Sequence, residues 1–239
     1  MHPDFARRAA LFAAVAALAA LAGCAAAPPA EPPLALVVVP EPERLGVYMQ
    51  GHPDERASLD RALAFTAQMR AGEGELIEAL QPHAFRPGAL IEEALTAALS
   101  RAGRAAVRVP SPMVEREEFL REYPLPAGAG KRGRYLDVYP VKVGFWNVWP
   151  AGAWQPWVVL KWRLYDGETR RELAGGIVNG GIGIGPAPGG ETIATVPPPD
   201  VSFRTWSVVR ENPPAVMAAI RAAIDRVAAA IVAQALAVR

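Results

Sequence analysis

The sequence predicts a single α+β domain over residues 34–239, with a mixed or antiparallel sheet, helices packed mainly on one face and a long C-terminal helix. Three observations predict it. The apolar run Leu34–Val39 is typical of a buried strand. Residues 157–165 alternate with a period of two, as a half-buried antiparallel strand does. Residues 213–237 repeat apolar side chains at helical spacing.

Composition narrows the possible functions before any motif is considered. The 239 residues include 25 Lys and Arg against 24 Asp and Glu, and the formal net charge of +1 argues against a nucleic-acid-binding protein. A single Cys excludes a disulfide framework and a multi-thiolate metal site. We therefore expect no cofactor and no resident metal. The alternative is a divalent ion bound by His52, Asp54 and Glu55. We favour the interpretation that these three are solvated loop residues.

The first 23 residues are typical of an export signal. Arg7 and Arg8 precede an apolar run over residues 9–22, which is shorter than the roughly 20 residues a transmembrane helix needs. The run ends in Leu21-Ala22-Gly23-Cys24, which resembles the lipobox of bacterial lipoproteins, and Cys24 is the only Cys of the chain. The resemblance implies cleavage before Cys24 and acyl chains, palmitate among them, on its thiol and new N-terminus. An ordinary secretory signal with a Cys near its cleavage site by chance is the alternative.

Residues 24–33 predict a lipidated Cys followed by a tether. Pro stands at four of the nine positions 25–33, which favours an extended chain reaching up to ~28 Å. Ala25 follows the Cys where Asp would imply retention in the inner membrane, so the lipobox resemblance implies the periplasmic face of the outer membrane. We therefore expect a periplasmic domain held at the membrane by the acyl chains on Cys24.

A strand–helix–strand unit opens the domain. The strand at 34–39 is stopped by Pro40 and Pro42, and helices are expected over 54–70 and, more briefly, 73–80. A stronger helix at 88–102 has apolar residues at three- and four-residue steps and is stopped by Gly103. A short strand at 105–109 completes the unit.

A meander of about three strands follows a helix fragment expected at 114–123. Its strands are predicted at 135–149, 157–165 and 171–178, with a hairpin turn at Asp166-Gly167. In the second strand Val158, Leu160, Trp162 and Leu164 face the core, while Lys161 and Arg163 face the other way. We expect a further strand at 201–209, and the last helix at 213–237 begins at two prolines, where a missing N–H costs little.

Residues 180–199 are rich in Gly and Pro and are expected to form a flexible loop, since they bear little apolar surface to bury. The Gly-rich run at 175–185 lacks the Lys-Ser/Thr ending of a phosphate-binding loop and is followed by Pro186. It therefore favours a hairpin tip over a nucleotide site. Residues 176–185 inserting into a membrane as a hairpin are the alternative.

Tryptophan is concentrated in one part of the chain. All six Trp lie between residues 146 and 206, and Trp162 belongs to the inward-facing set. Trp149, Trp154 and Trp157 flank the turn at 150–156 and are expected to crown a loop. Because tryptophan is enriched at binding hot spots and membrane interfaces, these three residues are candidate partner-binding residues. An aromatic cluster that closes the end of the sheet is the alternative.

The segment from Leu164 to Leu173 resembles a hairpin of small periplasmic lipoproteins. Its Asp166-Gly167 turn returns through Arg171-Glu172-Leu173, and a helix ending at Ala102-Gly103 and a C-terminal helix occur in the same order. The families in question are the curli-secretion lipoproteins and the lipoprotein activators of penicillin-binding proteins. The resemblance implies a fold like that of the N-terminal domain of the Tol–Pal propeller protein, and it supplies no catalytic motif.

These features predict a non-enzymatic, lipid-anchored protein that docks onto an envelope partner in an adaptor, assembly or transport-accessory role. A homo-oligomeric secretion or transport component that inserts hairpins into the outer membrane is the alternative. An anchored hydrolase is a third interpretation. It would require two of four carboxylates to converge in a cleft: Asp137, Asp166, Glu168 and Glu172.

Overall fold

The structure, a computed structural model, describes residues 33–42, 44–49, 59–111, 118–120, 123, 133–148, 152–181 and 193–238. The chain divides into two units, Met1–Pro32 and Pro33–Arg239, and every described residue belongs to the second. Cys24 and the tether up to Pro32 therefore lie outside the described residues.

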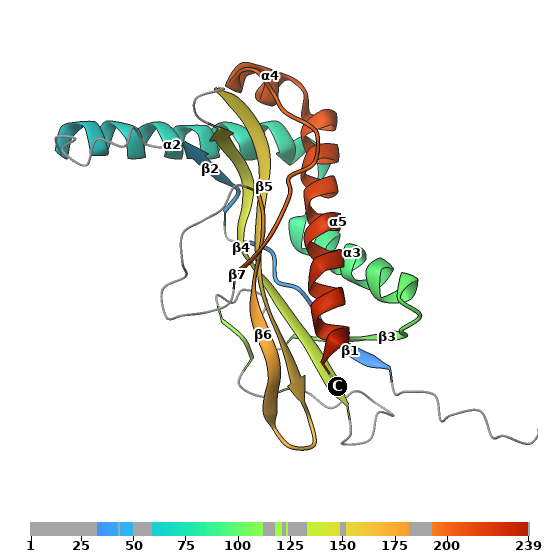
Figure 1. The fold of residues 1–239 in the computed structure, drawn as a ribbon. Coiled ribbons are helices and arrows are strands. Elements are labelled where there is room, and N and C mark those ends of the chain that lie inside the picture. The colour runs from blue at the N-terminus through green and yellow to red at the C-terminus, as the bar shows by residue number, and fades with distance from the viewer. Residues whose placement is uncertain are drawn as a thin grey trace, which may run out of the picture. The chain divides into compact units, whose positions relative to one another are not determined.

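Seven strands form one mixed sheet (Figure 1). They are β1 (Leu34–Val37), β2 (Gly46–Met49), β3 (Ala106–Val109), β4 (Arg134–Val148), β5 (Ala153–Asp166), β6 (Arg171–Gly180) and β7 (Ile193–Val196). The strand order is β3-β1-β4-β5-β6-β7. Strand β2 pairs with β4 as well, at residues further along β4 than those that pair with β1. Strands β4, β5 and β6 are antiparallel, whereas β1–β3, β1–β4, β2–β4 and β6–β7 are parallel pairs. Since β5 occupies one edge of β4, β1 and β2 share the other edge.

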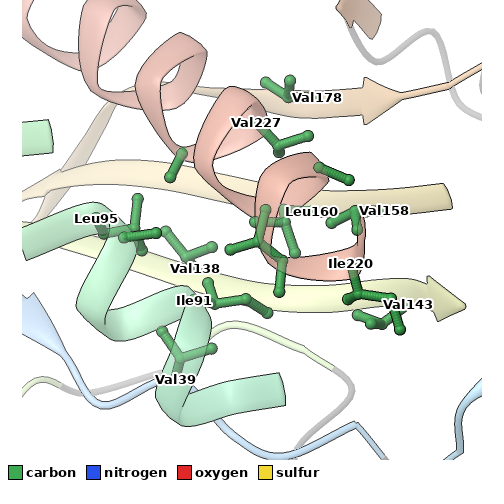
Figure 2. Close-up of a cluster of buried hydrophobic side chains, with 14 of the residues drawn as sticks. Val39, Ile91, Leu95, Val138, Val143, Val158, Leu160, Val178, Ile220 and Val227 are labelled. Carbon is green, nitrogen blue, oxygen red and sulfur yellow. The ribbon is translucent and has the colours of Figure 1, made fainter. Parts of the chain in front are cut away.

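Two helices cover one face of this sheet. The described helices are α2 (Leu59–Leu80), the 3₁₀ turn η1 (Gln81–His83), α3 (Pro87–Arg101), α4 (Trp206–Glu211) and α5 (Pro213–Ala237). Helices α3 and α5 pack against each other over β4 and β5 (Figure 1). Figure 2 shows the core between them, where side chains of α3 (Ile91, Leu95) and α5 (Ile220, Val227) meet those of the strands (Val138, Val143, Val158, Leu160, Val178).

The predicted fold class is confirmed. The described chain is an α+β domain with a mixed sheet, the β4–β5–β6 meander and the long C-terminal helix. The predicted strand–helix–strand unit is also present, because β1 and β3 are parallel neighbours joined through α3. Val158, Leu160, Trp162 and Leu164 all face the helices, as their alternation predicts.

Three predicted elements differ in the structure. Residues 59–80 form one helix, α2, in place of two, and a Cβ on Gly72 would lie 3.1 Å from the Val47 side chain, so the helix packs closely on β2 there. The predicted strand at 201–209 is wrong: Thr205 caps a helix, α4, and Phe203 alone bridges to Trp154. The short strand β7 lies inside the predicted Gly/Pro loop, and the sheet edge of β6 orders it. Residues 182–192 of that loop lie outside the described residues.

Two further predictions, a helix fragment at 114–123 and the half-burial of the strand at 157–165, also differ from the structure. The described part of the predicted helix fragment at 114–123, residues 118–120 and 123, is not helical. Strand β5 is more than half-buried, because Trp157 and Val159, which face away from the helices, are buried as well. Residues on both faces of the sheet are therefore covered at the middle of β5.

Candidate functional site: a cation–aromatic face of the sheet

The sheet face opposite α3 and α5 carries cations and aromatic rings in place of an aliphatic core. Alternation along β4 and β5 places a second set of side chains on this face: Tyr135, Asp137, Tyr139, Lys142, Trp146, Trp157, Lys161, Arg163 and Tyr165. We call this surface the cation–aromatic face.

A bulge in β4 determines which residues of that strand reach this face. The register with β5 shifts between Pro140 and Lys142, so Val141 is an extra residue and is 45% exposed. Beyond the bulge, Val143 and Phe145 return to the helix-covered core. Lys142 consequently lies on the cation–aromatic face.

Asp137 and Arg163, paired across β4 and β5, fix a separate stretch of chain to this face. Asp137 Oδ2 accepts hydrogen bonds from the Tyr123 hydroxyl (2.7 Å) and the Leu120 N–H (3.1 Å). Arg163 Nε donates to the Tyr123 hydroxyl oxygen (2.8 Å), and its Nη2 donates to the Leu120 carbonyl. We call residues 118–120 and 123 the strap. Asp137 and Arg163 therefore form hydrogen bonds with the backbone of Leu120 and with the side chain of Tyr123.

Aromatic packing completes the strap. The Tyr123 ring lies between those of Tyr135 and Tyr165, with centroids 5.0 and 4.7 Å away. The Arg163 guanidinium lies over the Phe119 ring at 4.7 Å. Burial, and then the charge of Asp137, raise the pKa of Tyr123 well above its usual value. The Tyr123 hydroxyl therefore stays protonated as a donor to Asp137.

A second cluster on this face is centred on Lys142. Its Nζ lies 4.5 Å from the ring centroids of both Tyr48 and Trp157, which meet edge to face at 4.6 Å. The Trp157 indole Nε1 donates to Asn179 Oδ1 at 2.7 Å, and Trp146 packs against the same indole. Burial lowers the pKa of Lys142. We call Lys142, Tyr48 and Trp157 the lysine box.

Glycines make room for the lysine box. Gly46 and Gly144 are paired between β2 and β4, and a Cβ on Gly46 would lie 2.1 Å from the Tyr48 ring. A Cβ on Gly181 would lie 2.5 Å from the Trp157 indole. Because real Cβ atoms do not approach so closely, the two rings pack directly on backbone at these positions.

The structure corrects the predicted role of two tryptophans. Trp154 and Trp157 do not crown a loop: β5 begins at Ala153, and their side chains are only 6% and 1% exposed. Trp154 packs against Trp206 at 4.7 Å, and its backbone exchanges two hydrogen bonds with Phe203. Trp149 lies outside the described residues. Trp162 is buried in the core, as predicted.

Three of the carboxylates considered for hydrolysis make contacts that hold the fold: Asp137, Asp166 and Glu172. Asp137 is fully buried and holds the strap. Asp166 Oδ1 accepts from the Glu168 and Thr169 N–H groups (2.9 and 2.7 Å) in the β5–β6 turn, and these bonds lower its pKa. Glu172 lies 3.9 Å from Arg163. Within the described ranges no three His, Cys, Asp or Glu residues group as metal ligands; His52, Asp54 and Glu55 lie outside those ranges.

The strap and the lysine box were not predicted from the sequence. The available signal is a charged residue in the middle of an otherwise aromatic and β-branched strand, as Asp137 and Lys142 are in β4. Lys161 and Arg163 do face away from the helices, as the alternation of β5 predicts. Their partners lie far off in sequence, so alternation alone does not identify them.

Eleven chains among the solved structures match this one, and two of them are similar over most of their own length. No family model matches the chain, and no curated protein does. A Xanthomonas campestris protein of family DUF330 has a TM-score of 0.44 at 11% identity, over 88% of this chain and 90% of that one. The Neisseria meningitidis lipoprotein GNA1162 has a TM-score of 0.27 at 18% identity, over 62% of this chain and 81% of that one. These scores are too low to support conclusions about function. The resemblance to curli-secretion and penicillin-binding-protein-activator lipoproteins stays a prediction.

Proposed function

We propose that this chain is a lipid-anchored envelope protein whose α+β domain docks onto a partner protein at the periplasmic face of the outer membrane. The observation that carries the proposal is Cys24, the only Cys of the chain, at the end of the lipobox-like Leu21–Cys24. The Pro-rich tether then leads directly to the first strand, which begins at Leu34. None of the described helices is long and apolar enough to cross a membrane.

We propose a non-enzymatic role for the domain. Two of the carboxylates that a hydrolase would need are engaged in holding the fold, Asp137 on the strap and Asp166 in the hairpin turn. The hydrogen bonds from Thr169 and Glu168 lower the pKa of Asp166, which suits a structural role better than that of a general acid. The anchor, the spacer and a domain of this size suit presentation of a surface to a neighbouring protein.

The docking surface includes Trp149. Of the three tryptophans predicted to bind a partner, Trp154 and Trp157 are buried in β5, so this part of the proposal rests on Trp149. Further along the chain, Gly152 and Ala153 are half-buried, and Ala153 begins β5. A tryptophan side chain can supply a large apolar contact to a partner.

Crosslinking in detergent-solubilised envelopes, followed by affinity capture of the lipidated protein, tests the proposal. We expect one discrete heterologous protein to be captured by the wild-type chain and lost with Trp149→Ala. Val208→Ser, which changes an exposed apolar residue on α4, is the matched control and should leave capture unchanged. Complexes that contain this chain alone would contradict docking and favour the homo-oligomer. Capture that survives Trp149→Ala would remove Trp149 from the docking surface.

A further inference from the structure

We infer that the lysine box binds an oxyanion, a carboxylate or phosphate group, through the Lys142 ammonium and the Tyr48 hydroxyl. The inference concerns the described residues of β2, β4 and β5 alone and does not depend on the membrane anchor. It adds a ligand site on the cation–aromatic face, separate from the strap.

The first step is that Lys142 has no counter-ion among the described residues. Its ammonium contacts the two rings of the box and forms no hydrogen bond or ion pair with any described residue. By contrast, Arg163 on the same face donates to Tyr123 and Leu120 and lies near Glu172. A half-buried cation normally has an anionic or hydrogen-bonding partner, because desolvating it without one is costly. Toward the described part of the chain, the N–H donors of Lys142 therefore remain available to an anion.

The two rings of the lysine box stabilise the charge of the Lys142 ammonium but accept no hydrogen bond from its N–H groups. A cation over an aromatic face is attracted by the ring quadrupole, but the ring supplies no lone pair for an N–H group. A lysine ammonium has three N–H donors and no acceptor. An oxyanion is the group that supplies both negative charge and acceptor oxygens. A quaternary ammonium ligand is disfavoured, since Lys142 already occupies the aromatic faces.

Tyr48 supplies a second donor. Its hydroxyl forms no hydrogen bond with the described residues, and its ring is one of the two that Lys142 covers. Burial and the charge of Glu73 on α2 raise the pKa of Tyr48, so the hydroxyl keeps its proton. Burial lowers the pKa of Lys142, and its ammonium lies over the Tyr48 ring at 4.5 Å.

The box is held in place before any ligand arrives. Trp157 is fixed by its hydrogen bond to Asn179 and by contact with the Gly181 backbone, and Tyr48 packs on Gly46. Lys142 and Tyr48 are both half-buried, so each keeps surface that a ligand can reach. A preformed pair of donors loses little conformational freedom on binding.

A fluorescence titration tests the inference, because the Lys142 ammonium touches the Trp157 indole. We expect the full lipidated chain in neutral detergent to respond saturably to inorganic phosphate or acetate at constant ionic strength, with chloride as the reference salt. Lys142→Met removes the charge and keeps the apolar stem, and should weaken binding at least about tenfold. Tyr48→Phe keeps the ring and should weaken it by a smaller factor. Lys161→Met, a lysine of the same face, is the matched control and should bind as wild type.

Two results of the titration would overturn the inference. The inference is overturned if the wild-type chain gives no saturable response to either anion, or if Lys142→Met, with an unchanged circular dichroism spectrum, responds like wild type. The source of the oxyanion is tested by reconstitution in phosphatidylcholine vesicles with and without phosphatidylglycerol. A weaker phosphate response in the phosphatidylglycerol vesicles identifies a lipid headgroup as the ligand, and an equal response identifies a soluble anion.

Discussion

The Tyr123 hydroxyl joins two charged side chains of neighbouring strands to the strap. It donates to Asp137 and accepts from Arg163, so its removal leaves both charges with one partner fewer. We expect Tyr123→Phe to lower the free energy of unfolding by about 1–3 kcal/mol, the cost of unsatisfied charged partners in a part-buried site. Urea unfolding followed by circular dichroism measures it. Thr96→Val, which removes an exposed hydroxyl from α3, is a control that should change stability little; an equal effect of both substitutions would contradict the role of the strap.

The dependence of stability on alkaline pH is a second test of the Tyr123 hydroxyl. Because the pKa of Tyr123 is raised in the native state, its contribution to stability is complete below about pH 10, the ordinary tyrosine value, and is lost as the pH rises further. One such group lowers stability by about 1.4 kcal/mol per pH unit in that range. We expect Tyr123→Phe to show a shallower decline above about pH 10 than wild type. Some decline should persist, since the pKa values of Tyr48 and Tyr135 are raised too. Parallel slopes for the two proteins would contradict the assignment.

For single residues, the sequence predicts which face of the sheet a side chain lies on better than it predicts which residues that side chain contacts. The period of two in β5 places Lys161 and Arg163 on the face away from the helices. It does not show that Arg163 meets Tyr123, which is 40 residues earlier in the chain. It also does not show that Trp154 and Trp157 are buried, because aromatic residues beside a Pro- and Gly-containing turn are equally typical of an exposed loop. Side-chain contacts of this kind depend on tertiary packing, which local patterns do not encode.

Two glycines of different elements should respond to alanine in opposite ways. A Cβ on Gly144 would lie 1.8 Å from the Gly46 carbonyl oxygen, so Gly144→Ala must separate β2 from β4 and disturb the lysine box. We expect a loss of at least about 2 kcal/mol in the free energy of unfolding. A Cβ on Gly74, inside α2, meets nothing within 4 Å, so Gly74→Ala should raise it by about 0.5–1 kcal/mol. Thermal unfolding of both variants checks the pair, and stabilisation by Gly144→Ala would contradict the close approach of the two strands.

The elements that the sequence predicts well are those with strong internal patterns. Helices α3 and α5 repeat apolar residues at helical spacing, and β5 alternates, so their positions follow from local sequence. Elements that depend on distant contacts are predicted poorly. Strand β7 is four residues long and is ordered by β6, and the N–H groups that begin α3 bond to Glu41, 47 residues before Gly88. Short strands and long-range caps gain their stability from tertiary pairing rather than from propensity.

For the molecule as a whole, the predicted anchor divides the chain into a membrane-bound terminus and a folded domain. The described domain begins at residue 33, one residue before β1, and β1 is itself held in the sheet by pairing with β3 and β4. Loss of the acyl chains should therefore change the location of the protein without changing the fold of the domain. This separation makes the anchor testable independently of stability.

Cys24→Ser is the substitution that tests the anchor. Cys24 is the only thiol of the chain, and a serine hydroxyl is not a substrate for the lipidation that the lipobox resemblance implies. We expect the wild-type protein to incorporate labelled palmitate and to sediment with the membranes, because two or more acyl chains give stable anchoring. The Cys24→Ser protein should carry no label and should lose its stable association with the membrane, while its urea midpoint stays equal to that of wild type. Ala25→Ser, one residue later, is the matched control and should be labelled normally. Membrane retention of an unlabelled Cys24→Ser chain would show that the protein is held by another part of its sequence, and a wild-type chain that takes up no label would rule out the lipoprotein assignment.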